Sequence, residues 1–233
     1  MKLVRFDNYD EYRQVQVSAN KLKYRNVYAE GAELRKIAEH VKRHAGQPKT
    51  GLCHGVRNGY EVRALRALLP SVDIIGTDIA ETAAALPNCI IWDMHELKPE
   101  WIGAVDFMYS NSWDHTYDPE RLFTNWSQCL SSKGRLYLTY TDAHSDIGAT
   151  EDTKVDAFGC SLDELLSIVA RVFVVEDVLE TTPHVTAKAL RNRLSYLRAG
   201  RFNRFLTAPL RSRRILTIVL KKRPGLNRDG ATA

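Results

Sequence analysis

The chain has 233 residues, of which 44% are hydrophobic and 26% are charged. This is an ordinary globular composition, and it excludes disorder, collagen and a coiled coil as descriptions of the whole chain. No apolar run approaches the roughly 18 residues of a membrane-spanning helix, and the N-terminus, MKLVRFDNYDEY, lacks the apolar core of a signal peptide. The four cysteines have no CxxC spacing, so we expect neither disulfides nor a zinc site and predict a cytoplasmic protein.

The chain alternates short apolar runs with helical patterns. Residues 9–44 predict helices, and Gly46 to Pro48 end them. The predicted strands are 51–54, 72–76, 89–92, 105–109, 135–140 and 172–179, and the helices between them are 60–69, 81–86, 119–130 and 162–169. This succession is typical of an α/β fold with a mostly parallel sheet and helices on both faces.

The last part of the chain differs from the rest in charge. Residues 1–180 hold 20 Lys and Arg against 27 Asp and Glu, whereas residues 181–233 hold 13 against one. Residues 185–206 can form a basic helix, and the strand ILTIVL follows between basic residues. The strands at 172–179 and within 211–223 therefore suit a terminal antiparallel pair with a basic helical insertion between them.

The stretch GLCHGVRNGYEV has glycines at 51, 55 and 59 between a strand and a helix. Such a turn lets a ligand approach backbone N–H groups at a helix N-terminus, although glycine turns also serve plain chain reversal. Asp78 follows the next strand, where a carboxylate can accept hydrogen bonds from both ribose hydroxyls of an adenosine-type cofactor, or can cap a helix.

The third predicted strand ends in Asp93 and Met94. A carboxylate there can accept a hydrogen bond from the exocyclic amine of adenine, and Met94 can supply apolar contact to the ring. A single aspartate at a strand end is usually a turn residue. A glycine loop and two aspartates at three successive strand ends favour a nucleoside site.

With these motifs, residues 50–180 resemble the class I S-adenosylmethionine-dependent methyltransferases, whose fold is Rossmann-like and seven-stranded. The resemblance continues through the segment AVDFMYSNSWDHTYDPERLF and the turn LSSKG. It implies S-adenosylmethionine as the cofactor. It also implies that the glycine loop holds the methionine part, that Asp78 holds ribose and that Asp93 meets adenine. The implied cofactor-binding residues are Gly55, Arg57, Gly59, Asp78, Ile79, Asp93, Met94, Ser110 and Asn111.

Two positions depart from the family pattern. Cys53 stands where the family has an acidic residue at the end of its first strand, and Arg57 replaces the middle glycine of the loop. Arg57 could instead reach the cofactor carboxylate. A non-catalytic relative therefore stays an alternative. A nicotinamide dehydrogenase is disfavoured because the loop lacks the GxGxxG spacing.

The loop NSWDHTYDP after the fourth core strand offers groups for catalysis. A hydroxyl acceptor must lose its proton, and His115 is the first candidate base, with Asp114 orienting it or binding substrate. Alternatively, His115 caps the helix that begins near Pro119. Asp142 and His144, after the next strand, are second candidates near the substrate. We expect no metal, because metal-dependent relatives have an acidic residue at the position of Ser110 and Asn111.

The sequence pattern and the resemblance together divide the chain into parts. Residues 1–48 would form a helical lid in which Asn20 and Tyr24 lie above the site, although a packing role fits this segment equally well. Residues 49–182 would form the cofactor-binding core. Residues 183–223 would add the basic insertion and the last strand, and residues 224–233 a disordered tail.

We therefore predict an O-methyltransferase that acts on a small-molecule or saccharide-type acceptor in glycan or secondary-metabolite biosynthesis. The basic stretch 188–206 would bind a phosphate of the acceptor or an anionic membrane surface, or would be a solvated helical face. RNA is a less favoured partner. The alternatives are an RNA methyltransferase and a non-catalytic protein that uses this stretch to bind a membrane or nucleic acid.

Overall fold

The structure is a computed structural model that describes residues 1–44, 46–141, 144, 154–181 and 215–224. The predicted basic insertion, most of the predicted tail and Asp142 lie outside the described residues. No described helix combines the length and the apolar character needed to cross a membrane.

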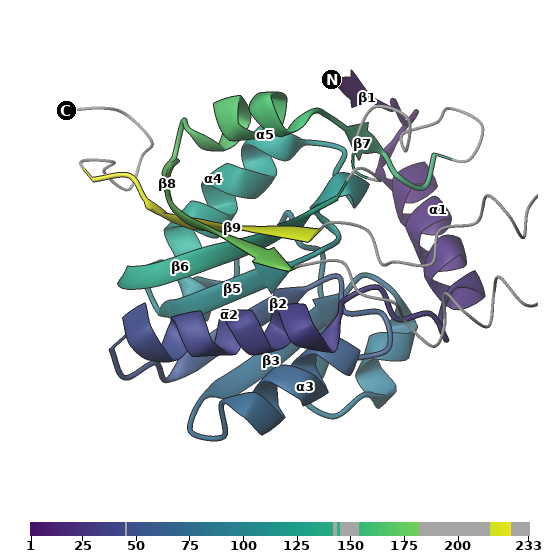
Figure 1. The fold of residues 1–233 in the computed structure, drawn as a ribbon. Coiled ribbons are helices and arrows are strands. Elements are labelled where there is room, and N and C mark those ends of the chain that lie inside the picture. Colours follow the sequence, from purple (N-terminus) through teal and green to yellow (C-terminus); the bar gives the residue numbers. More distant parts are fainter. Residues whose placement is uncertain (45, 142–143, 145–153, 182–214, 225–233) are drawn as a thin grey trace, which may run out of the picture.

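The core is a seven-stranded sheet in the order β4-β3-β2-β5-β6-β9-β8 (Figure 1). Its strands are β2 (Thr50–His54), β3 (Asp73–Asp78), β4 (Cys89–Ile91), β5 (Val105–Ser110), β6 (Leu130–Tyr140), β8 (Phe173–Thr181) and β9 (Ile215–Lys222). β9 pairs antiparallel with both β6 and β8, and the other pairings are parallel. The predicted mostly parallel α/β sheet with a terminal antiparallel pair is confirmed.

Helices cover both faces of this sheet. The helices are α1 (Tyr9–Leu22), α2 (Gly31–His44), α3 (Tyr60–Leu68), α4 (Pro119–Cys129) and α5 (Leu162–Val169), with 3₁₀ turns η1 (Glu81–Ala85), η2 (Pro99–Trp101) and η3 (Trp113–His115). α2 and α3 lie on one face and α4 and α5 on the other, while α1 stands beside one end of the sheet (Figure 1). The predicted N-terminal segment is therefore divided between a sheet-covering helix and a helix at the strand ends.

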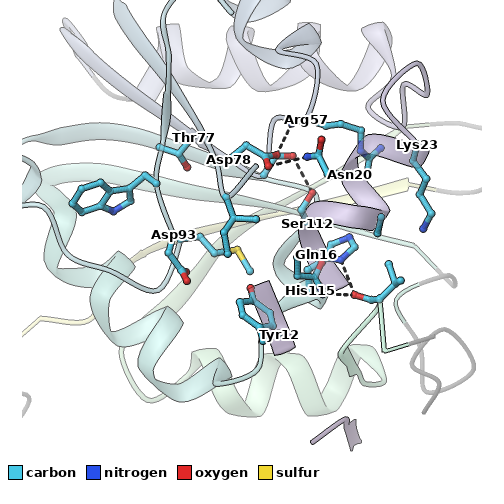
Figure 2. Close-up of a pocket in the computed structure, with 16 residues that line it drawn as sticks. Tyr12, Gln16, Asn20, Lys23, Arg57, Thr77, Asp78, Asp93, Ser112 and His115 are labelled. Atoms are coloured by element: carbon cyan, nitrogen blue, oxygen red, sulfur yellow. Dashed lines mark hydrogen bonds between the residues drawn. The ribbon is translucent and has the colours of Figure 1, made fainter. Parts of the chain in front are cut away.

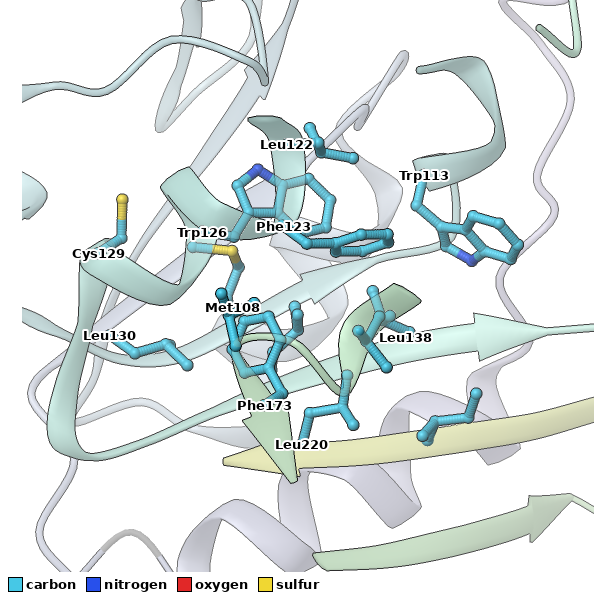
Figure 3. Packing of buried hydrophobic residues seen from close by; sticks show 14 of the residues in the cluster. Met108, Trp113, Leu122, Phe123, Trp126, Cys129, Leu130, Leu138, Phe173 and Leu220 are labelled. Carbon is cyan, nitrogen blue, oxygen red and sulfur yellow. The ribbon is translucent and has the colours of Figure 1, made fainter. Parts of the chain in front are cut away.

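The central strands are apolar on both sides, because successive side chains of a strand point to opposite faces. Phe107 and Tyr109 of β5 pack with α2 and α3, whereas Met108 between them packs with α4. In β9, Val219 belongs to the cluster on the side of α2 and α3, and Leu220 belongs to the cluster on the side of α4. Figure 3 shows the cluster on the side of α4, with Met108 near Trp126 of that helix and Leu220 on β9.

Two features differ from the sequence expectations. The predicted turn at Lys133–Gly134 lies within β6, which begins at Leu130 and pairs with β5 through a register shift. A two-residue antiparallel pair, β1 (Lys2–Leu3) with β7 (Phe158–Gly159), is not predicted at all. Strands this short carry no periodic pattern, so the sequence could not indicate them.

Candidate active site

The glycine loop follows β2 and lies beside the first residues after β5. Gly55 has φ +74°, and a Cβ atom there would lie 2.5 Å from the Ser112 Cβ atom, so only glycine fits. The Ser112 hydroxyl donates a hydrogen bond to the Gly55 carbonyl at 3.2 Å. β2 and β5 are neighbours although β3 and β4 separate them in sequence, so this is the point where ligands bind in open α/β sheets.

Arg57 is the unusual residue of this loop. It adopts a left-handed conformation, φ 44°, which is rare for a residue with a side chain and is found mostly at functional positions. Its guanidinium lies 4.9 Å from the centre of the Tyr28 ring. Its buried Nε atom has no hydrogen-bond partner among the described residues. A buried guanidinium nitrogen without an acceptor suits an anionic group of a ligand.

Asp78 ends β3 and is almost fully buried. Oδ2 accepts a hydrogen bond from the Arg57 backbone N–H at 2.8 Å, and Oδ1 accepts bonds from Ala80 N–H at 3.0 Å and the Asn20 side chain at 2.8 Å. Burial raises the pKa of Asp78 above its usual value, although the backbone hydrogen bonds act in the other direction. The carboxylate is held firmly toward α1 and the glycine loop.

Asp93 follows β4 and is held by two elements. Oδ1 accepts hydrogen bonds from the His95 backbone at 2.8 Å and from its ring Nδ1 at 2.7 Å, and Oδ2 accepts one from the Tyr9 hydroxyl of α1 at 2.8 Å. Burial acts to raise the pKa of Asp93, but these hydrogen bonds and the His95 ring lower it below the usual value. α1 therefore contacts both predicted nucleoside-binding carboxylates.

A small cavity of about 60 Å³ lies between α1 and the ends of β3 and β4 (Figure 2). α1 contributes Tyr12, Gln16 and Asn20, which are four residues apart and so share one helix face. Predicted site residues that line it are Asn20, Gly55, Arg57, Asp78, Ile79, Asp93, Met94 and His115. The structure thus brings most of the predicted cofactor-binding residues around one cavity.

A larger cavity of about 440 Å³ adjoins the first, since Lys23, Gly55, Arg57, Ser112 and His115 line both. Its other lining residues include four that the sequence analysis did not select, Glu61, Thr139, Thr141 and Asp156, and three that it did, Asn111, Asp114 and His144. The site is therefore a small cavity beside α1 that adjoins a larger cavity lined by polar side chains.

His115 lines both cavities, and Asp114 beside it lines the larger one. His115 Nδ1 donates a hydrogen bond to the Val155 carbonyl at 2.8 Å, and Gln16 donates to the same carbonyl at 2.9 Å. The alternative in which His115 caps α4 is wrong. Asp118 caps that helix, because its side chain accepts the Arg121 backbone N–H at 3.0 Å.

Three predicted residues do not line either cavity. Ser110 is fully buried, and its hydroxyl donates to the His54 carbonyl at 3.3 Å. Gly59 precedes α3 with φ +69°. Tyr24 lies beyond α1, where its carbonyl accepts the Asn58 side chain at 2.8 Å. Asp142, as noted, lies outside the described residues.

The sequence analysis missed several lining residues. Ser112 follows Ser110 and Asn111 directly, so the position after β5 could have indicated it. Asp156 has no such signal, because it lies in an irregular segment that reaches the site through the β1–β7 pair. Glu61 looks like an ordinary residue of the first turn of α3.

Neither a protein-family model nor a curated protein matches the sequence. The structure is similar to a 1,6-didemethyltoxoflavin-N1-methyltransferase of Burkholderia thailandensis, solved with S-adenosylhomocysteine, at 15% identity and a TM-score of 0.62. That likeness covers 94% of this chain and 92% of the other. A geranyl diphosphate C-methyltransferase of Streptomyces coelicolor A3(2), solved with Mg²⁺, geranyl diphosphate and S-adenosylhomocysteine, matches at 13% identity and a TM-score of 0.61, over 91% and 98% of the chains.

These likenesses show that the chain has the Rossmann-like fold of class I S-adenosylmethionine-dependent methyltransferases, as the sequence predicts. The [4+2]-cyclase SpnF is also similar, at 13% identity and a TM-score of 0.60 over 95% of this chain and 99% of that one. The same fold therefore carries different reactions, and the function must be argued from the site.

Proposed function

We propose that the protein is an S-adenosylmethionine-dependent methyltransferase that methylates a hydroxyl of a polar small molecule, such as a saccharide. The observation that carries this proposal is the small cavity, where Asp78 and Asp93 from two adjacent strand ends meet the left-handed glycine loop. The solved structures of similar fold include an N-methyltransferase and a C-methyltransferase of small molecules.

The residues present fit such a cofactor. Asp78 would bind the ribose hydroxyls, with Ile79 beside it, and Asp93 with Met94 would bind adenine. The unpartnered Nε of Arg57 suits the carboxylate of the methionine part. When bound, S-adenosylmethionine supplies a methyl group on a positively charged sulfur.

The larger cavity is the proposed acceptor site, because it adjoins the small one and is lined by polar side chains. A hydroxyl acceptor must lose a proton on methylation. His115 lines both cavities and Asp114 lines the larger one, and they are the groups placed to assist that loss. Orienting the acceptor against the methyl group would supply much of the rate.

Titration calorimetry with S-adenosylmethionine and S-adenosylhomocysteine tests the proposal. Asp78→Ala should weaken binding of both compounds by about tenfold or more, because it removes the acceptor of charge-assisted hydrogen bonds. Asp73→Ala is the matched control, since Asp73 lies exposed at the other end of β3 and pairs with Arg66. A wild-type protein that binds neither compound would defeat the proposal. Labelled methyl incorporation into bulk RNA would favour the RNA methyltransferase instead.

A further inference from the structure

Three side chains with metal-ligand atoms meet at the wall of the larger cavity. Asp114, His115 and Asp156 each present one such atom, and these atoms lie within 4.8 Å of one another. His115 Nε2 lies 4.0 Å from Asp114 Oδ1 and 3.9 Å from Asp156 Oδ1. Two ligand atoms bound to one ion at about 2.1 Å stand about 3.0–3.5 Å apart at tetrahedral or cis-octahedral angles, so binding of a shared cation draws both carboxylates about 0.5–1 Å closer to Nε2.

The His115 ring is oriented as a metal ligand would be. Nδ1 faces a backbone carbonyl, that of Val155, and a carbonyl oxygen only accepts, so Nδ1 carries the hydrogen. In the neutral ring this leaves the lone pair of Nε2 directed at the two carboxylates. Metal-binding histidines commonly donate their other N–H to a carbonyl in this way. Gln16 of α1 donates to the same carbonyl and so helps to fix it.

Asp114 supplies an independent observation. Only 7% of the residue is exposed, yet its buried Oδ1, the atom that faces His115, has no hydrogen-bond partner among the described residues. Its other oxygen lies 3.9 Å from His144 Nε2, which is also beyond hydrogen-bond distance. Leaving a buried carboxylate oxygen unsatisfied is costly, and a cation removes that cost.

An ion pair between a protonated His115 and the carboxylates is the competing explanation. Charge-assisted N–H···O bonds close to about 2.7–2.9 Å, whereas both carboxylates stand about 1 Å farther from Nε2. The spacing is therefore too wide for direct pairing, and it leaves space between the three groups for an ion that draws them together.

We propose that Asp114, His115 and Asp156 bind a first-row divalent cation such as Mn²⁺. One imidazole nitrogen with two carboxylates favours these ions over Mg²⁺ or Ca²⁺, which prefer oxygen ligands alone. All three residues line the larger cavity, so positions left open on the cation would face an acceptor oxygen. That last step rests on the proposed function, whereas binding of the cation does not.

Titration of the full chain with Mn²⁺, after treatment with a chelator, tests the site. Calorimetry and electron paramagnetic resonance monitor the binding. We expect one Mn²⁺ per chain, with electron-spin-echo modulation from one imidazole nitrogen. Asp114→Asn and Asp156→Asn should each weaken binding by about tenfold or more, and His115→Gln should remove the nitrogen modulation. Asp177→Asn, on β8, is the matched control and should bind as the wild type does.

Circular dichroism melting shows which variants are folded, and the half-exposed Asp156 gives a variant that should fold even if Asp114→Asn does not. The proposal is overturned if the wild type binds no Mn²⁺ at millimolar concentration, if the folded variants bind as well as the wild type, or if no nitrogen modulation is seen. Calorimetry with S-adenosylhomocysteine on the same samples separates the two proposals. A protein that binds S-adenosylhomocysteine but not Mn²⁺ overturns the cation site alone. A protein that binds Mn²⁺ but not S-adenosylhomocysteine overturns the methyltransferase proposal alone.

Discussion

Glu61 shows how a single buried group sets a pH dependence. It lies in the first turn of α3 beside the larger cavity, and its Oε2 has no hydrogen-bond partner among the described residues. Burial raises its pKa from 4.5 to about 7. Between these pH values the native protein binds more protons at Glu61 than the unfolded chain does. The contribution of Glu61 to the free energy of unfolding therefore falls as pH rises through this window, and it is constant above it.

Glu61→Gln removes this penalty because the amide stays neutral. At pH 8 the variant should be more stable than the wild type by up to about 3 kcal/mol, and near pH 4 the two should be alike. Urea unfolding at both pH values measures the difference, with the exposed Glu39→Gln as control. An equal difference at the two pH values would show that Glu61 is not titrating in this window.

A site residue could be predicted from the sequence where it lies at the end of a predicted strand or helix. Asp78 and Asp93 could be predicted because the first ends β3 and the second closely follows β4, and parallel strands end at the same sheet edge. Asp156 could not, because its place depends on the pairing of Lys2 with Gly159, which is a long-range contact between unpatterned segments. The burial of Glu61 and its lack of a hydrogen-bond partner at Oε2 among the described residues also depend on packing that the sequence does not reveal.

At the scale of elements, α1 determines access to the proposed cofactor site. Asp78 Oδ1 already accepts two hydrogen bonds, from Asn20 and from the Ala80 backbone, and Oδ2 accepts one. A carboxylate has about four acceptor positions, so two ribose hydroxyls require one present donor to leave. The backbone donors are fixed, and the Asn20 amide is therefore the donor that must be displaced. The 60 Å³ of the small cavity also requires α1 to withdraw before a nucleoside can enter.

Asn20→Ala should therefore bind S-adenosylhomocysteine more tightly, by a factor of about 2 to 10, since the competing hydrogen bond is gone. Calorimetry measures the change, and Ser18→Ala on the exposed face of α1 is the control. Weaker binding by Asn20→Ala would instead mean that the amide contacts the cofactor itself.

Most elements were predictable because their periodicity is local. α5 begins and ends where the sequence predicts, helped by a capping box between Ser161 and Glu164. The course of β6 was not, since Lys133 and Gly134 have turn character but are held in the strand as an irregularity against β5. The division of the N-terminal helices between sheet and site is likewise a matter of tertiary packing.

At the scale of the whole molecule, β9 joins the edge strand β8 to the rest of the sheet. It lies between β6 and β8 and pairs with both along its length. Ile215, Ile218, Val219 and Leu220 are all buried there. Burying four such side chains contributes roughly 6–12 kcal/mol, which is comparable to the whole stability of a typical domain, about 5–15 kcal/mol.

A chain truncated after residue 182 should therefore fail to fold, because β6 and β8 lose their shared partner. Circular dichroism should show no cooperative unfolding transition for it, whereas a chain truncated after residue 224 should unfold like the full protein. A cooperative transition in the shorter chain would mean that the first six core strands form a stable sheet without β9.

A crystal structure of the full chain with S-adenosylhomocysteine tests the central claim most directly. We predict that both ribose hydroxyls lie within hydrogen-bond distance of the Asp78 carboxylate, that adenine lies beside Asp93 and Met94, and that Asn20 has moved off Asp78. A nucleoside bound elsewhere, with Asp78 still held by Asn20, would contradict the account.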